Sequence, residues 1–430
     1  MGFKYWSANC LLGLFLVSPA YADPAPEEIL RDAALYTVKV KTLGDIGLNK
    51  DEGGSSTGTG FLIDRKRGWL LTNAHVATRS PAKIEVSFKD GASITAKRIH
   101  VDAYIDMAVL QIPVSNIPNA AIEAKLSCGD LPSPGTPVLA YGHPWSIPYT
   151  ATRGIVSGVS WFYPHEHVQT DALINSGNSG GPLINASNGQ VVGINTATYS
   201  DKSDKNASAV SLAEPMPAIC RVIALLRDGK DTRLKLLPLA TATSGDDIRP
   251  RVARPYADKS KFQPGDLIVK INGSGPVRSL PDLIDRLRGL GERGTVTVDR
   301  KGKLIDIETT LETKPDPLKN RSINISGMVI SNPWKLDDQE LNPEGYLVID
   351  WIETDKQVAL TEAKVSDRIV RVDGLKFSSA DALYSYLATL KPDAEIDFVL
   401  RGLSKEPEYL MEYRQVALSR AELTLIRLDE

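Results

Sequence analysis

The sequence has 430 residues, of which 42% are hydrophobic and 24% are charged, and its formal net charge is −3. The length predicts two to four domains, and the composition is ordinary for globular protein. A net charge this close to zero gives no basis for binding nucleic acid or an anionic membrane surface.

The first 22 residues predict a signal peptide. Lys4 supplies a positive charge, residues 11–17 supply an apolar run, and Ala20-Tyr21-Ala22 fits a small-x-small cleavage site. The apolar run is too short to span a bilayer, which takes about 20 helical residues. We therefore expect an exported protein whose mature chain begins near Asp23.

Cleavage there removes Cys10 and leaves two cysteines, Cys128 and Cys220. An oxidising compartment allows them to pair. The sequence does not show whether their Cα atoms come within bridging distance, and two buried thiols fit it at least as well. Neither lies in a motif typical of a nucleophile.

Residues 33 to 215 predict short strands separated by frequent turns. Val38–Val40 and Ile84–Phe88 alternate apolar and polar residues, and further short apolar runs end at Gly, Pro, Asn or Asp. This pattern predicts an all-β sandwich or barrel. From Pro215 to Leu226 the apolar period changes to that of a helix, and Asp228-Gly229 ends the helix.

The rest of the chain contains an internal repeat. Residues 262–273 resemble residues 365–374, and the aspartates Asp266 and Asp367 lie 101 residues apart. After each copy we expect a helix, over 280–290 and over 379–390, and then a β-rich stretch. Two copies indicate a duplicated domain, because a solenoid needs at least about three repeats.

Three short motifs carry candidate chemistry. His75 follows an apolar strand, Asp106 opens another, and Ser179 lies in the glycine-rich turn Gly177-Asn178-Ser179-Gly180-Gly181. Each motif alone fits a structural residue or a tight turn. Together, in the order His, Asp, Ser, they match the order of chymotrypsin-type barrels.

These residue types suit acyl transfer. His75 can take the proton of the Ser179 hydroxyl and return it to the leaving amine, while Asp106 holds the imidazole in the required tautomer. The glycines let the N–H groups of Gly177 and Ser179 converge as an oxyanion hole. We therefore predict a catalytic triad of His75, Asp106 and Ser179.

The chain also resembles the HtrA/Deg family of serine proteases over about residues 33 to 428. Gly58–Ile63 resembles the family's glycine-flanked strand before the histidine, and Asn175–Leu183 is very similar to its serine motif. The chain departs from the family at His143, where Asn is usual, and at Leu212-Ala213-Glu214-Pro215, where Phe-Ala-Ile-Pro is usual.

The resemblance implies a mainly β fold, with a chymotrypsin-like double β-barrel followed by two α+β PDZ-like domains. The boundaries would be a signal peptide at 1–22, the protease domain at 23–230 and PDZ-like domains at 231–315 and 321–428. It also implies a periplasmic location, with a secretory pathway elsewhere still open, and a homo-oligomer built on trimers. No cofactor motif is present.

The resemblance places Ile174, Thr198 and Tyr199 at the wall of the specificity pocket, although these residues fit packing of the barrel equally well. No aspartate marks the pocket for Lys or Arg, so we expect a modest apolar side chain. Activity would depend on ordering of the loops 160–170, 173–178 and 197–208, since Asn178 replaces the aspartate that pairs with a new N-terminus in trypsin-like zymogens.

PDZ-like domains add an extended chain end to a sheet edge and hold its carboxylate in a backbone nest. Ile325, Ser326, Gly327 and Met328 resemble that loop in the second copy. The corresponding segment of the first copy, Leu234–Pro238, has no glycine and contains a proline, so a structural role there is at least as consistent.

These expectations lead to an endoprotease that degrades unfolded or damaged exported proteins and binds C-terminal peptides at PDZ-like domain 2. Two alternatives remain: a chaperone or PDZ scaffold with a little-used protease domain, and a signalling protease with few substrates. His165 and His167 fit a loop or hairpin better than a metal site, because no third ligand motif accompanies them.

Overall fold

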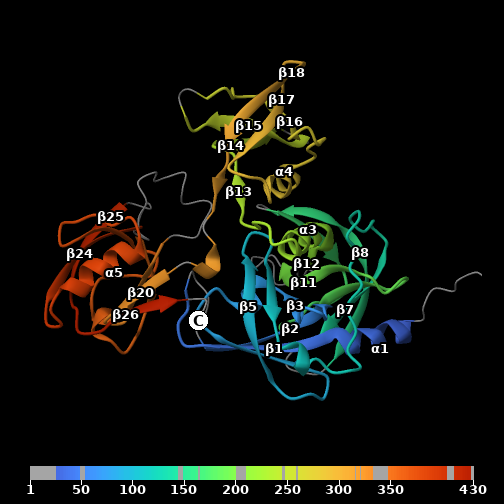
Figure 1. Ribbon diagram of the computed structural model, residues 1–430, viewed down its shortest axis with the longest axis horizontal. Helices are drawn as coiled ribbons and strands as arrows, with labels where there is room; N and C mark the ends of the chain where they lie inside the picture. The colour runs from blue at the N-terminus through green and yellow to red at the C-terminus, as the bar shows by residue number, and fades with distance from the viewer. Residues whose placement is uncertain are drawn as a thin grey trace, which may run out of the picture.

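The computed structural model describes residues 26–48, 54–143, 149–162, 165–199, 210–244, 247–257, 260–314, 316–319, 321–332, 347–403 and 411–427. The predicted signal peptide, residues 1–22, lies outside them. Two closed six-stranded barrels are followed by a two-stranded, a five-stranded and a seven-stranded sheet, which confirms the mainly β fold with a double barrel (Figure 1). No helix in the described part of the chain is long and apolar enough to cross a membrane.

The first barrel has the strand order β1-β2-β3-β6-β5-β4. Its strands are β1 (Thr37–Gly44), β2 (Gly54–Asp64), β3 (Trp69–Thr72), β4 (Lys83–Phe88), β5 (Ile94–Asp102) and β6 (Met107–Gln111). Alternate residues of β1 and β4 point into the core, as the sequence pattern predicts. Helix α1 (Pro26–Tyr36) packs on this barrel through Ile29, Ala33 and Tyr36.

The second barrel has the order β10-β11-β12-β9-β8-β7. Its strands are β7 (Pro137–Gly142), β8 (Thr150–Phe162), β9 (His165–Thr170), β10 (Pro182–Asn185), β11 (Val191–Tyr199) and β12 (Val210–Pro215). Helix α3 (Met216–Arg227) follows and buries Met216, Ile219, Val222 and Ile223, the apolar face expected from the sequence. It ends at Asp228, also as expected.

A disulfide joins Cys128, in the segment between the barrels, to Cys220 in α3. The Cα atoms are 5.6 Å apart, within the range for such a bond. The bond closes a loop that contains the whole second barrel, and it resolves the choice between paired and free cysteines that the sequence left open.

The middle domain, residues 235–313, is built on the sheet β14-β15-β16-β17-β18. Its elements are β13 (Lys235–Leu236), β14 (Leu239–Ser244), β15 (Asp247–Pro255), β16 (Leu267–Ile271), α4 (Leu280–Leu287), β17 (Arg293–Arg300), β18 (Lys303–Thr310) and β19 (Glu312–Thr313). The Ser279 side chain caps α4 by accepting a hydrogen bond from the Asp282 N–H. The helix ends at Leu287, three residues earlier than predicted, because Arg288 is extended.

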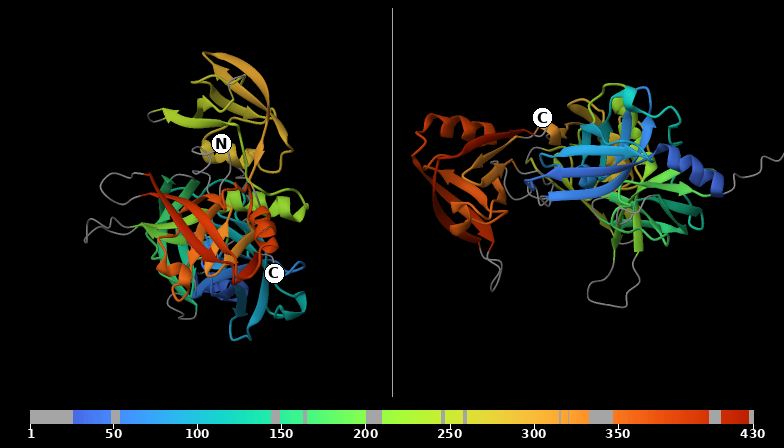
Figure 2. Two further views of the ribbon diagram at one scale, coloured as in Figure 1. Left: turned by 90° about the vertical axis from the view of Figure 1, so that its left-hand side faces the viewer. Right: turned by 90° about the horizontal axis from the view of Figure 1, so that it is seen from below.

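The C-terminal domain, residues 321–427, contains the seven-stranded sheet β25-β24-β23-β22-β21-β20-β26. Its elements are β20 (Arg321–Ile325), β21 (Met328–Ser331), β22 (Leu347–Ile352), β23 (Arg368–Val372), α5 (Ala380–Thr389), β24 (Glu395–Leu403), β25 (Met411–Ser419) and β26 (Leu423–Arg427). This domain lies beside the barrels and away from the middle domain (Figure 2). Leu48, after β1, packs against its residues Val329 and Ile426.

The internal repeat has a structural basis. Asp266 and Asp367 are both buried at the start of a strand, and each accepts a hydrogen bond from the N–H of the residue three positions earlier. Each carboxylate also pairs with an arginine of a neighbouring hairpin, Arg300 at 2.7 Å and Arg414 at 2.5 Å. The duplicated aspartates therefore stabilise the same turn in both domains.

Candidate active site

His75 lies on the one-turn helix α2 (Ala74–Ala77), directly after β3 of the first barrel. Asn73 precedes the helix and donates a hydrogen bond from its side chain to the carbonyl of Asp106 at 2.8 Å. The His75 N–H donates to one carboxylate oxygen of Asp106 at 3.0 Å, and His75 Nδ1 lies 2.7 Å from the other. The backbone and the ring are thus both held against the same carboxylate.

Asp106 lies in the turn before β6, where its φ of +40° is uncommon for a residue with a side chain. Burial opposes ionisation of this carboxyl. The charge of His75 and the hydrogen bonds from His75 and Thr196 outweigh burial and lower the pKa of Asp106 below its ordinary value. The group is therefore a carboxylate at neutral pH, as an orienting partner for an imidazole must be.

Ser179 lies in the turn before β10 of the second barrel. Its Oγ donates a hydrogen bond to the carbonyl of Thr196 at 3.0 Å. The hydroxyl of Thr196 in turn donates to Asp106 at 2.6 Å. Thr196 therefore connects the serine turn of the second barrel to the histidine–aspartate pair of the first.

Thr196 had no predicted role, although its segment follows the serine motif in the sequence. The sequence offered one clue to this role: Thr196 is a polar residue two positions after Ile194 in an otherwise apolar strand. That signal is weak, because only the closed second barrel brings β11 next to Asp106.

The glycine-rich turn has the backbone geometry that the sequence predicts. Gly177 has a φ of +102°, which favours glycine, and Gly180 has no room for a side chain because a Cβ there would lie 2.1 Å from the carbonyl oxygen of Thr59. Within the described residues, the N–H groups of Gly177 and Ser179 donate no backbone hydrogen bond. The role of these two N–H groups as an oxyanion hole stays a prediction.

Asn178 lies between these donors and is fully buried. Neither atom of its side-chain amide has a hydrogen-bond partner among the described residues. This neutral amide stands where trypsin-like zymogens place an aspartate. Activation without a new N-terminus stays a prediction.

The three residues predicted for the specificity pocket have different surroundings. Ile174 is buried in the core of the second barrel, packed with residues such as Val168 and Leu183. This burial favours the packing role that the sequence left open. Thr198 is exposed on β11, and its hydroxyl donates to the carbonyl of Ile174 at 2.6 Å. The side chain of Tyr199 lies outside the described residues, as do residues 163–164 and 200–209 of the predicted regulatory loops.

The predicted carboxylate loop of the C-terminal domain lies at the hairpin between β20 and β21 in this structure. Ile325 and Met328 are buried, and Ser326 and Gly327 form the turn between β20 and β21. The Ser326 N–H donates to the carbonyl of Glu422, and the Gly327 N–H donates to the Asn324 side chain. Strand β21 is paired on both sides, with β20 and β22, so it has no free edge for a peptide.

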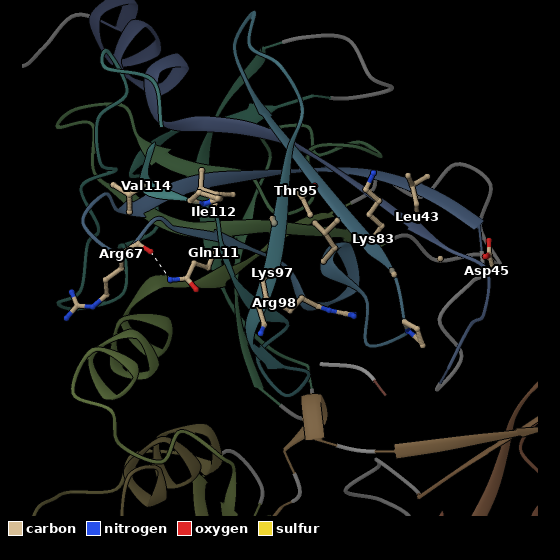
Figure 3. A pocket seen from close by; sticks show the side chains of 16 residues that line it. Leu43, Asp45, Arg67, Lys83, Thr95, Lys97, Arg98, Gln111, Ile112 and Val114 are labelled. Carbon is tan, nitrogen blue, oxygen red and sulfur yellow. Dashed lines mark hydrogen bonds between the residues drawn. The ribbon is translucent and has the colours of Figure 1, made fainter. Parts of the chain in front are cut away.

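A hollow of about 970 Å³ opens on the outer surface of the first barrel, lined by residues of β1, β4, β5 and β6 and of the turns beside them (Figure 3). None of His75, Asp106 and Ser179 lines it.

Among the described residues, no three His, Cys, Asp or Glu side chains lie close enough to hold a metal ion. His167 instead lies 3.4 Å from Glu214, across β9 and β12.

Two closed barrels, a close histidine–aspartate contact between His75 and Asp106, and a glycine-rich serine turn define a chymotrypsin-type serine peptidase. The model of the trypsin-like peptidase domain family matches residues 58–194. A probable periplasmic serine endoprotease, DegP-like, from Pseudomonas putida is 30% identical over 359 residues, which cover 76% of this chain and 72% of that protein. The chain belongs to the HtrA/Deg family of serine proteases.

Further comparisons agree with this family. A DegP-like protein of Hahella chejuensis is 34% identical over 282 residues, covering 60% of this chain and 58% of that protein, so the matched region is less than two thirds of that relative. Among solved structures, the HtrA-type protease AlgW with tripeptide has a TM-score of 0.55 and 26% identity, covering 68% of this chain and 99% of that one.

Proposed function

We propose that the protein is an exported serine endoprotease that cleaves unfolded or damaged proteins with His75, Asp106 and Ser179. The observation that carries the proposal is the link through Thr196, which bonds to Ser179 with its carbonyl and to Asp106 with its hydroxyl. Family membership supports the same reaction. The names of the relatives, which call them periplasmic, support a periplasmic location.

In the proposed reaction, His75 Nδ1 faces Asp106, so Nε2 is the ring nitrogen that accepts the proton of Ser179. The Ser179 oxygen attacks the scissile carbonyl carbon, and the carbonyl oxygen takes its negative charge toward the N–H groups of Gly177 and Ser179. His75 then gives the proton to the leaving amine, and water releases the acyl group by the same steps. The Ser179 hydroxyl must first leave the Thr196 carbonyl.

Hydrolysis of unfolded casein by the mature chain from Asp23 tests the proposal, beside Ser179→Ala and with a fluorophosphonate probe. We expect cleavage and covalent labelling by the wild type and neither by the variant. If the wild type neither cleaves nor reacts, even with C-terminal peptides added, the chain is a chaperone or scaffold instead.

The substrate's side chain before the cleaved bond is proposed to be small to medium and apolar, such as Val, Ala or Leu. Thr198 is the exposed candidate for the pocket wall, and Ile174 supports it from the barrel core. Sequencing the casein fragments tests this preference. Cleavage mainly after Lys or Arg would contradict it.

We further propose that residues 231–315 and 321–428 are PDZ-like domains that regulate an oligomer built on trimers. Light scattering of the purified protein tests the assembly, with a mass that is a multiple of three chains expected. A monomer at working concentration would contradict it.

Binding of C-terminal peptides to the second PDZ-like domain is proposed to require separation of β20 from β21, because β21 has no free edge. Asn324 and Val329 face each other across this pair. The double change Asn324→Cys and Val329→Cys would fasten the strands together. We expect peptide binding to be lost in the oxidised double variant and restored by reductant, with reductant-treated wild type as control. Unchanged binding by the oxidised variant would contradict strand separation.

A further inference from the structure

Thr59, on β2 of the first barrel, lies directly beneath the serine turn of the second barrel and is fully buried. Its backbone N–H donates to the carbonyl of Ser179 at 2.9 Å. Its hydroxyl donates to the carbonyl of Gly177 at 2.7 Å. One residue thus binds the two carbonyls that flank Asn178, the residue between the proposed oxyanion donors.

The surroundings of the Thr59 hydroxyl fix the direction of its hydrogen bond. The backbone N–H of His143 donates to this oxygen at 3.1 Å, and His143 Nδ1 lies 3.4 Å from it. The hydroxyl has one proton, and the Gly177 carbonyl can only accept. Thr59 therefore gives its proton to Gly177, the nearer acceptor at 2.7 Å, and accepts a hydrogen bond from the backbone N–H of His143.

The imidazole of His143 reinforces this arrangement as a neutral group. Burial, with a smaller effect of Lys39, lowers the pKa of His143 to about 4. The ring also packs edge-on against Tyr149, with the ring centroids 4.7 Å apart. The ring beside Thr59 therefore stays uncharged throughout the neutral pH range.

We propose that Thr59 is a positioning residue for the oxyanion hole. The Gly177 carbonyl belongs to the peptide group that joins Gly177 to Asn178, so a bond to that oxygen sets the orientation of this peptide. Gly177 has a φ of +102°, and the Asn178 N–H of the same peptide donates to the carbonyl of Asn175 at 2.9 Å, so Thr59 and Asn175 hold this peptide from opposite sides. Thr59 keeps the Gly177 and Ser179 N–H groups directed at the substrate.

Neighbouring atoms leave little room for an alternative arrangement. A Cβ at Gly181 would lie 2.3 Å from the Tyr141 carbonyl and 3.1 Å from the Thr59 methyl group, and one at Gly142 would lie 2.8 Å from the Thr59 hydroxyl. The turn is thus packed tightly around Thr59, but only the hydroxyl bonds to the Gly177 carbonyl. Its effect can be separated from packing by removing the hydroxyl alone.

Thr59→Val removes the hydroxyl and keeps the shape, and Thr59→Ser keeps the hydroxyl. The inference rests on the proposed protease function, so the assay uses wild-type protein that cleaves a fluorogenic casein-derived peptide. We expect kcat of Thr59→Val to fall between about tenfold and a few hundredfold with KM nearly unchanged, since loss of a whole oxyanion donor lowers kcat by about 10²–10³. Thr59→Ser should retain at least about a third of wild-type kcat.

Thr297→Val is the matched control. Thr297 is a buried threonine of the middle domain whose hydroxyl donates to Asp306 at 2.7 Å, far from the proposed site in the sequence and in the fold. We expect its kcat to equal that of the wild type. The rate of labelling of Ser179 by a fluorophosphonate should fall in Thr59→Val in parallel with kcat, at temperatures well below the unfolding midpoint of each variant.

The outcomes distinguish this inference from the proposed function. If the wild type does not cleave or label, the proposed function fails. If it does, and Thr59→Val retains full kcat, the positioning role is wrong. Should Thr59→Val fail to fold, Thr59→Ser and Thr59→Cys replace it, because cysteine is a much weaker donor of similar size. Equal kcat for the serine and cysteine variants would then overturn the inference.

Discussion

The guanidinium of Arg288 is fully buried between the middle domain and the first barrel. It lies 2.6 Å from the carboxylate of Asp102, at the end of β5, and donates to the carbonyl of Thr232 at 3.1 Å. Asp102 in turn accepts hydrogen bonds from the N–H groups of Tyr104 and Ile105, in the turn that leads to Asp106. A residue of the middle domain therefore supports the turn that carries the proposed triad aspartate.

The magnitude follows from burial. Asp102 is 6% exposed and Arg288 is 0% exposed, so removing the arginine leaves a carboxylate without a counter-charge or access to water. Arg288→Met keeps most of the side-chain volume, so the loss of stability is mainly the electrostatic cost and not the cost of a cavity. Breaking a buried pair from one side costs about 3–5 kcal/mol, and we expect a loss of unfolding free energy in this range.

The pH dependence has a definite sign. Burial raises the pKa of Asp102, but the charge of Arg288, with smaller contributions from hydrogen bonds, lowers it below its ordinary value overall. The pair's contribution is therefore present above the unfolded pKa of about 4 and is lost as the pH falls through the folded value. Urea unfolding should therefore be measured at a pH of about 7, where the pair contributes fully.

Urea unfolding, followed by tryptophan fluorescence, measures the loss. Arg249→Met is the matched control, since Arg249 forms an exposed pair with Asp247 at 2.7 Å, and we expect no change in its midpoint. Adding Asp102→Asn to Arg288→Met should recover part of the loss, because Asp285 is then the one carboxyl left of the two that pair with Arg288 among the described residues. If Arg288→Met unfolds at the same urea concentration as Arg249→Met, the reasoning is refuted.

Three more perturbations test charges and covalent bonds. Burial raises the pKa of Asp285 from 3.8 to about 6, so the folded state binds this proton more tightly than the unfolded state does. The free energy of unfolding should therefore fall by at most about 3 kcal/mol as the pH rises from about 4 to about 6. Asp285→Asn should flatten this part of the pH–stability curve, and an unchanged curve would contradict the raised pKa. Replacing Cys128 and Cys220 by serine should lower the free energy of unfolding by about 2–4 kcal/mol. The urea midpoint should fall, and reductant should no longer change it. A midpoint equal to that of the wild type would contradict this expectation. Asn178→Asp places a carboxylate at a buried position whose side chain has no hydrogen-bond partner among the described residues, so the urea midpoint and casein cleavage should both drop and partly recover in acid. A variant as stable as the wild type at neutral pH would show that the turn is open to water.

The local patterns of the sequence were sufficient for the barrels and for the candidate triad. Alternation in β1 and β4 and the period of α3 report which face is buried, and this depends only on neighbouring residues. His75 and Ser179 lie in short motifs whose glycines and apolar flanks are contiguous in the chain. The triad assignment remains a prediction, and the contact between His75 and Asp106 is consistent with it.

The predicted peptide site shows where local resemblance was insufficient. The segment Ile325–Met328 has the residues of a carboxylate-binding loop, but in the fold its N–H groups are used by Glu422 and Asn324. Those partners come from β20 itself and from the turn before β26, nearly a hundred residues away. Whether an edge is free is a property of the whole sheet, and no local motif reports it.

By itself the sequence determined the class of fold, the order of the candidate catalytic residues and the duplication, because each depends on short-range spacing and on burial patterns. Only the tertiary structure decided which residues support the site. Thr59 and Thr196 reach the serine turn and the aspartate turn through hydrogen bonds between the two barrels, and Arg288 reaches the aspartate turn through an ion pair from the middle domain. Such contacts require two surfaces to close on each other, and packing of the whole chain sets that closure.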